Sequence, residues 1–234
     1  MAETTITCPD GKFSAYVATP KSLAAGKKVP GILVIQEIFG VNKVMRDLCD
    51  GYAAQGYLAL CPDIFWRQEP GIQITDKTEA EWKRAFELYQ GFNEAKGAQD
   101  LIASLDHLRK QPACNGKAGA VGYCLGGKLA YLMATRSDAD CSVGYYGVGI
   151  EGALDEAKNI KKPLLLHIAA KDQYCPPEAQ AKIQASLKGN AHVAIHVYPG
   201  MDHAFARPGG QHYDKASADL ANSRTAEFFR KNLA

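Results

Sequence analysis

Short apolar runs alternate with amphipathic segments along almost the whole chain, and this alternation constrains the fold most. Apolar runs of strand length occupy residues 13–19, 31–36, 57–61, 118–123, 141–146, 163–169 and 192–198. Helical periodicity falls between most of them, over residues 41–55, 78–110, 125–136, 176–187 and 216–231. Strands that alternate with helices predict an α/β fold, with a mainly parallel sheet covered by helices on both faces. No helical pattern separates the first two strands, so we expect residues 13–19 to pair antiparallel at an edge of the sheet.

Length and charge exclude several classes of protein. The 234 residues suit one domain that spans residues 1–234. The net charge is only +2 and no block of Lys and Arg occurs, so we expect no nucleic-acid partner. The longest aliphatic run, residues 32–35, is far too short to cross a bilayer, and the first ten residues contain no apolar secretion segment. We therefore expect no membrane partner and a cytoplasmic location.

The cysteines are odd in number and scattered, without a C-x-x-C pair. A disulfide framework and a zinc ribbon both need a different pattern, so a reducing cytoplasm is the simplest environment. Most of these thiols should be small buried hydrophobic groups, and a catalytic role for any of them requires a special context. The seven are Cys8, Cys49, Cys61, Cys114, Cys124, Cys141 and Cys175.

Three of the expected strands end in residues with unusual chemistry. Cys124 follows residues 118–123 directly, Asp172 follows residues 163–169, and His203 comes shortly after residues 192–198. Ligands of open α/β sheets bind beyond the carboxyl ends of the strands, which is where these residues fall. Their order along the chain is nucleophile, acid, histidine, as in the hydrolases of this fold class.

The segment Gly122-Tyr123-Cys124-Leu125-Gly126 is a G-x-C-x-G motif, the cysteine version of the strained turn that carries a nucleophile between a strand and a helix. The glycines allow close backbone approach, and a helix N-terminus favours a thiolate. His203 would take the thiol proton and deliver it to the leaving group, while Asp172 would orient the imidazole. The plain alternatives are a buried structural cysteine, an acidic helix cap and a solvated loop histidine.

Other motifs point less clearly to a function. Gly122–Lys128 matches G-x-x-x-x-G-K, so a nucleotide-binding protein is an alternative from another class, although the next residue is Leu129 rather than Ser or Thr. A binding module without catalysis is a third reading, against which the complete set of three residues argues. His192 and His196 share one strand face without a third ligand nearby, and Asp202 beside the loop histidine is an isolated pair.

We therefore expect no metal. Two other histidines are interpreted as structural: His107, which lies on a helical segment, and His167, which lies within an apolar run.

Four segments together resemble the dienelactone hydrolases of the α/β-hydrolase superfamily, and the similarity extends over nearly the whole chain. They are Gln36-Glu37-Ile38-Phe39-Gly40, residues 121–127, Gly144-Tyr145-Tyr146-Gly147 and His203-Ala204-Phe205-Ala206-Arg207. The resemblance implies an α/β-hydrolase fold and an enzyme that opens the enol-lactone ring of 4-carboxymethylenebut-2-en-4-olide to maleylacetate, a step in the degradation of catechols. It implies no cofactor and a small lactone or ester as the partner. We expect a monomer.

Residue by residue, the resemblance implies a set of roles. The triad would be Cys124, Asp172 and His203, with Glu37 as the partner of the resting thiol, Arg207 as a clamp on the substrate carboxylate, and the backbone N–H groups of Leu125 and Ile38 as the oxyanion hole. Without the resemblance, Glu37 and Arg207 would be read as ordinary loop residues.

The substrate pocket departs from the pattern of the family. Aligned by apolar spacing, Trp82 stands where a second carboxylate-binding arginine belongs, and Phe86 stands where a tyrosine belongs. The machinery thus resembles the family while the pocket differs, which keeps a carboxylesterase with a neutral ester substrate open as an alternative. Because a thiolate is itself a good leaving group, the chemistry favours activated esters or lactones over simple alkyl esters.

Overall fold

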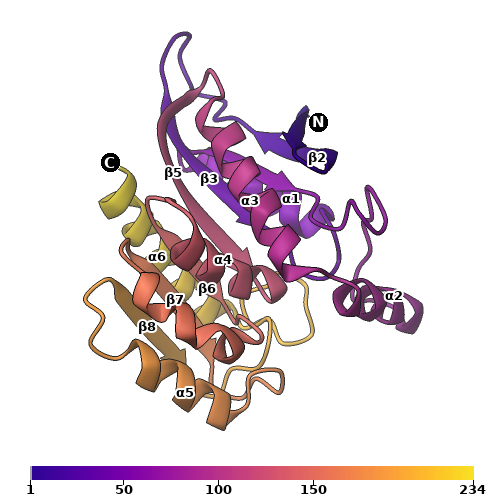
Figure 1. Ribbon diagram of the computed structural model, residues 1–234, viewed down its shortest axis with the longest axis vertical. Coiled ribbons are helices and arrows are strands. Elements are labelled where there is room, and N and C mark those ends of the chain that lie inside the picture. Colours follow the sequence, from indigo (N-terminus) through magenta and orange to yellow (C-terminus); the bar gives the residue numbers. More distant parts are fainter. Residues whose placement is uncertain (1) are drawn as a thin grey trace. The chain divides into compact units, whose positions relative to one another are not determined.

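The computed structural model describes residues 2–234 in two compact units, residues 2–119 and 120–234. Figure 1 shows their elements. The first unit contains β1 (Ala2–Cys8), β2 (Gly11–Ala18), β3 (Val29–Ile35), α1 (Lys43–Ala54), β4 (Leu58–Pro62), α2 (Glu79–Gln90) and α3 (Glu94–Arg109). The strand β5 (Cys114–Tyr123) leads into the second unit, which continues with α4 (Leu125–Arg136), β6 (Ser142–Tyr145), η1 (Ile150–Asn159), β7 (Leu164–Ala169), α5 (Pro177–Leu187), β8 (Val193–Tyr198) and α6 (Lys215–Leu233). A single domain over residues 1–234 stays a prediction.

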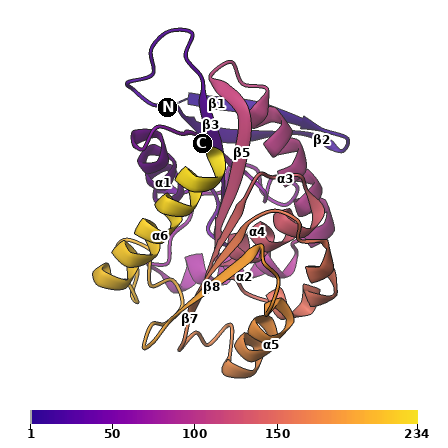
Figure 2. The ribbon, with the colours of Figure 1, turned by 90° about the vertical axis from the view of Figure 1, so that its left-hand side faces the viewer.

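In the first unit the strands lie in the order β1, β2, β4, β3. β3 and β4 are parallel, and their central residues are buried because helices cover both faces. Figure 2 shows α1 and α3 on opposite sides of these strands. The carboxyl end of β3 leads directly into Gln36, Glu37 and Ile38.

The expectation for residues 13–19 is half right. β2 pairs antiparallel with β4, as expected, with Ala15 opposite Pro62. It does not form the edge, because β1 pairs with its other side in a hairpin in which Cys8 lies opposite Gly11. The two-residue loop is Pro9-Asp10, and Gly11 follows it as the first residue of β2. The sequence Pro-Asp-Gly is typical of tight turns.

The single helix expected over residues 78–110 is wrong. The chain forms α2 and α3, which are separated at Gly91-Phe92-Asn93. Each has its own N-cap: Thr78 Oγ1 accepts from Glu81 N–H at 3.2 Å, and Asn93 Oδ1 accepts from Lys96 N–H at 3.0 Å. Glycine at the end of one helix and asparagine at the start of the next are the local signals for this break.

The second unit holds a parallel arrangement in the order β5, β6, β7, β8. All residues of β6 and β7 are buried, which explains why their sequences are mainly apolar. In Figure 2, α6 lies on one side of β7 and β8, and α4 and α5 lie on the other. The carboxyl ends of β5, β7 and β8 therefore open at one edge, and the loops that follow them carry Cys124, Asp172 and His203.

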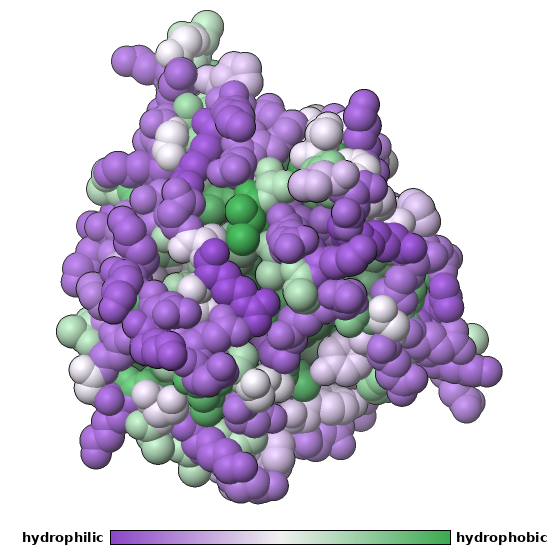
Figure 3. All heavy atoms as spheres, in the orientation of Figure 1, coloured by the Kyte–Doolittle hydropathy of each residue, from purple (hydrophilic) through white to green (hydrophobic). Residues whose placement is uncertain are grey.

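The surface offers few apolar residues. Figure 3 shows one face on which hydrophilic side chains predominate and hydrophobic ones form small scattered groups. Across residues 2–234, none of the helices is both long enough and apolar enough to cross a bilayer.

Candidate active site

Cys124 occupies a strained turn between β5 and α4. Its backbone has φ 56° and ψ −117°, a conformation that L-residues rarely adopt. The turn closes so tightly that a Cβ on Gly122 would lie 1.8 Å from the carbonyl oxygen of Gly126. Glycine is thus required at position 122 for the turn to form, which is the physical reason for the first glycine of the motif.

Backbone hydrogen bonds hold this turn. Cys124 N–H donates to the carbonyl of Tyr145 at 3.1 Å, and the N–H groups of Gly127 and Lys128 donate to the carbonyl of Cys124 at 2.9 and 3.3 Å. A phosphate-binding loop needs such amides for its ligand, so their engagement here argues against the nucleotide-binding alternative. Leu125 is the first residue of α4, where a backbone N–H has no acceptor within the helix and is suited to bind an anion.

His203 and Asp172 form a buried pair. His203 Nδ1–H donates to Asp172 Oδ2 at 2.8 Å, and the two residues are only 8% and 2% exposed. The other carboxylate oxygen of Asp172 accepts from Tyr174 N–H at 2.9 Å. With one oxygen fixed by the backbone and the other on the ring, the carboxylate sets the orientation of the imidazole.

The remaining partner of His203 is Cys124. Burial alone would lower the pKa of His203, but the charge of Cys124, a hydrogen bond to Asp172 and a hydrogen bond to Cys124 raise that pKa to about 10. The raised pKa keeps the imidazole of His203 protonated at neutral pH, beside the sulfur of Cys124. The structure thus brings the three residues expected at the strand ends into one hydrogen-bonded chain.

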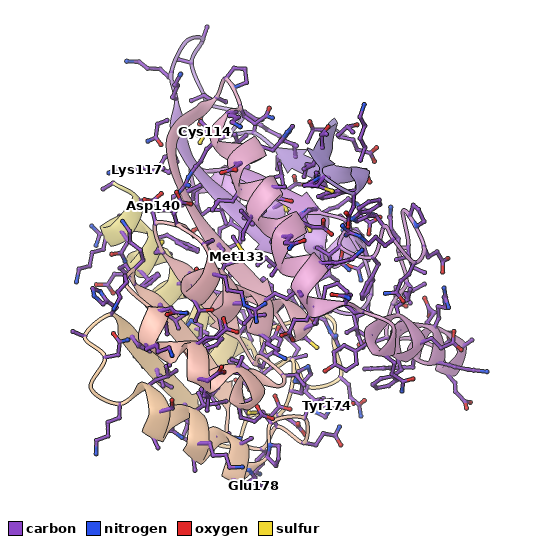
Figure 4. The ribbon with its side chains drawn as sticks, viewed as in Figure 1. Cys114, Lys117, Met133, Asp140, Tyr174 and Glu178 are labelled. Carbon is purple, nitrogen blue, oxygen red and sulfur yellow. The ribbon has the colours of Figure 1, made fainter. Side chains whose placement is uncertain are left out.

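Two aromatic rings enclose the imidazole of His203. The ring of Tyr146, which follows β6, meets it edge-on with centroids 5.2 Å apart, and Tyr174 does so at 4.9 Å. Figure 4 labels Tyr174 on the segment between β7 and α5, and its side chain is 37% exposed. Burial and then the charges of Cys124, Asp172 and Asp202 raise the pKa of Tyr174. The reading of the sequence assigned no role to either tyrosine; only Tyr146 lies in a segment quoted for the resemblance.

Backbone strain gathers around the same site. Among the described residues, three that are not glycine have positive φ: Cys124 at 56°, Tyr146 at 37° and Ala204 at 62°. They lie on the loops that follow β5, β6 and β8. Strained backbone persists where surrounding structure holds it, and it concentrates at functional sites. The motif around Cys124 predicts strain at that residue, whereas nothing in the sequence marks Tyr146 or Ala204 as strained.

Arg207 lies on the turn that begins at His203. Its N–H donates to the carbonyl of Ala204 at 2.9 Å, and its side chain is half-buried. The positive charge of Arg207 opposes the rise in the pKa of Tyr174, so the guanidinium lies near that tyrosine. A cation there suits an anionic group on a substrate.

The other expected site residues belong to the first unit. Glu37 and Ile38 are both buried just after β3, where Gln36 fixes the backbone. Gln36 Nε2 donates to the carbonyl of Glu37 at 3.2 Å, while its Oε1 accepts from Ile64 N–H at 3.2 Å. This segment is therefore a defined turn rather than a solvated loop, contrary to the reading of Glu37 without the resemblance.

Trp82 and Phe86 form an aromatic cluster with Phe39. The rings of Trp82 and Phe86 stack one helical turn apart with centroids separated by 5.6 Å, and Phe39 meets Trp82 edge-on at 5.1 Å. Trp82 Nε1–H donates to the carbonyl of Asp76 at 3.1 Å. Phe39, one member of the cluster, directly follows Ile38, the expected oxyanion-hole residue.

Arg84, the cation next to this cluster, is already engaged. Its guanidinium donates to the carboxylate of Glu69 at 2.5 and 2.8 Å and to that of Glu87 at 2.8 Å. Two carboxylates neutralise the charge of Arg84, which leaves it poorly suited to replace the arginine that Trp82 displaces.

Known proteins resemble this chain along its length. The model described as "Dienelactone hydrolase family" matches residues 13–233. A protein of Azospirillum brasilense, provisionally named carboxymethylenebutenolidase, is 55% identical over 232 residues, 96% of this chain and 95% of that protein. The carboxymethylenebutenolidase of Pseudomonas putida is 39% identical over 216 residues, 92% of this chain and 90% of that protein.

A solved structure extends the similarity to the fold. The crystal structure of a provisionally assigned dienelactone hydrolase from Klebsiella pneumoniae matches with a TM-score of 0.85 at 29% identity, over 98% of this chain and 97% of that chain. This match confirms the α/β-hydrolase fold that the sequence predicted.

Proposed function

Because the chain belongs to the dienelactone hydrolase family, we propose that it hydrolyses enol lactones and similarly activated esters through a thioester on Cys124. It is a hydrolase of the carboxymethylenebutenolidase type. The observation that carries the proposal is the buried hydrogen-bonded chain from Cys124 through His203 to Asp172. A strained nucleophile turn, a protonated imidazole and an orienting carboxylate are the parts that acyl transfer needs.

Acylation begins from the thiolate of Cys124 and the imidazolium of His203. The sulfur attacks the carbonyl carbon, and the oxyanion that forms is bound by the N–H group of Leu125, with the N–H group of Ile38 as the second donor that the family pattern implies. When the bond between the carbonyl carbon and the ester oxygen breaks, His203 gives its proton to the leaving oxygen. In an enol lactone that oxygen stays attached to the acyl chain, because the ring opens.

Deacylation uses the imidazole that acylation leaves neutral. His203 takes a proton from water while the oxygen attacks the thioester carbon, and the bond between that carbon and the sulfur then breaks. The acid is released, and Cys124 and His203 return to the thiolate and the imidazolium. Asp172 stays ionised throughout and stabilises the charged ring at each stage.

The nucleophile restricts the substrate to activated esters. A tetrahedral intermediate on sulfur collapses back to the ester whenever the thiolate leaves more easily than the alcohol. An enolate or a phenolate leaves readily, whereas a simple alkoxide does not. Enol lactones and aryl or enol esters are therefore the substrates that a Cys124 nucleophile supports.

One cationic residue, Arg207, and one acidic residue, Glu37, have further roles in the proposed reaction. Arg207 binds the carboxylate of an anionic substrate, a role supported by the family pattern and by the influence of its charge on the pKa of Tyr174. Glu37 is the partner of the Cys124 thiol before that thiol gives its proton to His203, a role that rests on the family pattern.

A second candidate function is hydrolysis of neutral esters. The aromatic cluster of Phe39, Trp82 and Phe86 and the engagement of Arg84 by Glu69 both favour an apolar acyl group over a second carboxylate clamp. On this view dienelactone is hydrolysed slowly and neutral aryl or enol esters faster.

A substrate panel tests the proposal. It contains dienelactone, phenyl acetate, vinyl acetate and ethyl acetate, each assayed with the wild type, Cys124→Ala and Cys8→Ala. Cys8 is the matched control because it and Cys124 are the two cysteines of the described chain that are not fully buried. We expect turnover of the activated esters, none of ethyl acetate, and loss only in the Cys124 variant. Comparable kcat/KM for ethyl acetate and phenyl acetate would contradict the thioester route.

A further inference from the structure

A continuous chain of hydrogen-bonded side chains runs through the interior of the second unit. Tyr198 Oη, on β8, lies 2.8 Å from His167 Nδ1 on β7. His167 Nε2 lies 2.9 Å from Thr225 Oγ1 on α6, which in turn lies 2.6 Å from Tyr145 Oη on β6. The ends reach the outer part of α6, where Arg224 donates to Tyr198 Oη at 3.2 Å and Tyr145 Oη donates to Asn222 Oδ1 at 3.0 Å.

The two ends fix the direction of every proton in this chain. The hydroxyl of Tyr145 donates its one proton to the side-chain oxygen Oδ1 of Asn222. In its bond with Thr225 it must therefore accept, and the hydroxyl of Thr225 donates. The hydroxyl of Thr225 then has to accept from His167, which places the ring proton on Nε2. Nδ1 is left as an acceptor for the hydroxyl of Tyr198.

The imidazole of His167 is neutral in this arrangement. Burial, and then the charges of His196 and Arg224, lower the pKa of His167 to about 3. One ring nitrogen donates and the other accepts, so both are satisfied without a charge. A fully buried imidazole with both nitrogens bonded is a rigid link between β7, β8 and α6.

Two residues connect this chain to the nucleophile and to its proton carrier. The carbonyl of Tyr145 accepts from Cys124 N–H at 3.1 Å, and its ring stacks on that of Tyr123 with centroids 4.8 Å apart. The carbonyl of His167 accepts from Tyr146 N–H at 2.8 Å, and the ring of Tyr146 contacts His203. Cys124 and Tyr146 are two of the strained residues of the site.

From this geometry we propose that the buried chain is a positioning device that holds the strained backbone at Cys124 and Tyr146, with His167 and Thr225 as its central positioning residues. The inference rests on the proposed function, because the buried chain affects catalysis only if Cys124 and His203 are the reacting groups whose separation it maintains. A small displacement of either reacting group lowers the rate of the chemical step without changing which substrate binds. The chain acts through Tyr145 and Tyr146 and touches no substrate.

A pair of substitutions at Thr225 separates the hydroxyl from the shape of the side chain. Thr225→Val keeps the volume and leaves Nε2–H of His167 without an acceptor, whereas Thr225→Ser keeps the hydroxyl. We expect Thr225→Val to lower kcat roughly 10- to 100-fold with little change in KM, and Thr225→Ser to stay close to the wild type. A role in stability alone would lower the melting temperature of both variants while leaving kcat of the folded fraction unchanged, and this result would overturn the proposal.

Two further measurements cover the case in which Thr225→Val fails to fold. Tyr145→Phe removes only a hydroxyl from the same chain and should lower kcat in the same way; wild-type kcat in a folded Tyr145→Phe protein would overturn the proposal. Long-range ¹H–¹⁵N spectra of the wild type should place the proton of His167 on Nε2. His196→Gln is the matched control for the kcat measurements. The ring of His196, on the neighbouring strand β8, stacks on that of His167 with centroids 6.1 Å apart but is not one of the linked side chains.

The rate of alkylation of Cys124 by iodoacetamide distinguishes the failure of this inference from the failure of the proposed function. Alkylation needs the positioned thiolate but no ester substrate, so Thr225→Val should slow it and Thr225→Ser should not. If the wild type hydrolyses no ester yet the two variants differ in alkylation, the proposed function fails and the positioning role stands. If the wild type is active and both variants match it in alkylation and kcat, the positioning role fails alone.

Discussion

Replacement of Asp172 by asparagine should lower the pKa of His203, which tests the electrostatics of the proposed site directly. Asp172 Oδ2 accepts from His203 Nδ1–H at 2.8 Å, and both groups are buried. A hydrogen bond to a charged group contributes about 1.5–3 kcal/mol, and one pKa unit corresponds to about 1.36 kcal/mol, so the pKa of His203 should fall by roughly one to two units. The charge of Cys124 remains in the variant, which keeps the pKa above its ordinary value.

The sign of the effect on stability follows from the same shift. The pKa of His203 is raised from 6.5 to about 10 on folding, so the protonated ring stabilises the fold fully below pH 6.5. That stabilisation is lost as the pH rises through about 10. In Asp172→Asn the loss should still begin near pH 6.5 but should be complete at a lower pH, so the total fall in the thermal midpoint on the alkaline side should be smaller than in the wild type.

Titration by NMR of the protein labelled with ¹³C in the histidine rings measures the pKa. His203→Gln assigns the signal, and Asp202→Asn is the matched control, because that carboxylate accepts from His203 N–H at 2.6 Å but does not bond to the ring. We expect a clear fall in the pKa of His203 for Asp172→Asn and little change for Asp202→Asn. The same ring pKa in Asp172→Asn and the wild type would refute the reasoning.

Other predictions follow from the turn and the pocket. Gly122→Ala forces a Cβ against the carbonyl of Gly126 and should lower the free energy of unfolding in urea by about 3 kcal/mol, whereas Gly152→Ala, which meets no atom within 4 Å, should change it by less than about 0.5 kcal/mol. Trp82→Arg should raise kcat/KM for dienelactone relative to phenyl acetate by roughly tenfold. Arg207→Ala should lower the same ratio, and an unchanged ratio in either variant would argue against the proposed pocket.

The positions of the three main site residues could be predicted because buried parallel strands leave a clear mark in a sequence. The strands β6 and β7 are mainly apolar, so their ends can be read to within a residue or two, and Asp172 stands out after β7. The motif around Cys124 is equally local, since the tight turn itself dictates glycine at position 122. Features that depend on residues close together in the sequence can be predicted in this way.

The break between α2 and α3 and the hairpin of β1 and β2 also have local sequence signals, but stronger patterns in the neighbouring residues outweigh those signals. Strong helical periodicity on both sides of Gly91 hid the break between α2 and α3, although Asn93 caps the second helix. The hairpin at Gly11 was missed because β1 alternates between polar and apolar residues and lies at an edge. Short amphipathic strands carry little apolar signal.

Other features depend on contacts between distant parts of the chain and could not be predicted. Tyr174 and Tyr146 face His203 only because three loops meet, and the raised pKa of that histidine depends on charges that the sequence places far apart. His167 was expected to be structural, yet its bonds to Thr225 and Tyr198 link residues more than 30 positions apart. Periodicity carries no information about such pairs.

Direct detection of the acyl-enzyme tests the central claim, that Cys124 is the nucleophile. Wild-type protein is mixed with p-nitrophenyl acetate, quenched in acid during the burst, digested and examined by mass spectrometry. We predict an acetyl group on the peptide that contains Cys124, labile to neutral hydroxylamine as a thioester should be, and no adduct in Cys124→Ala. An adduct on another residue, or wild-type turnover by Cys124→Ala, would contradict the account.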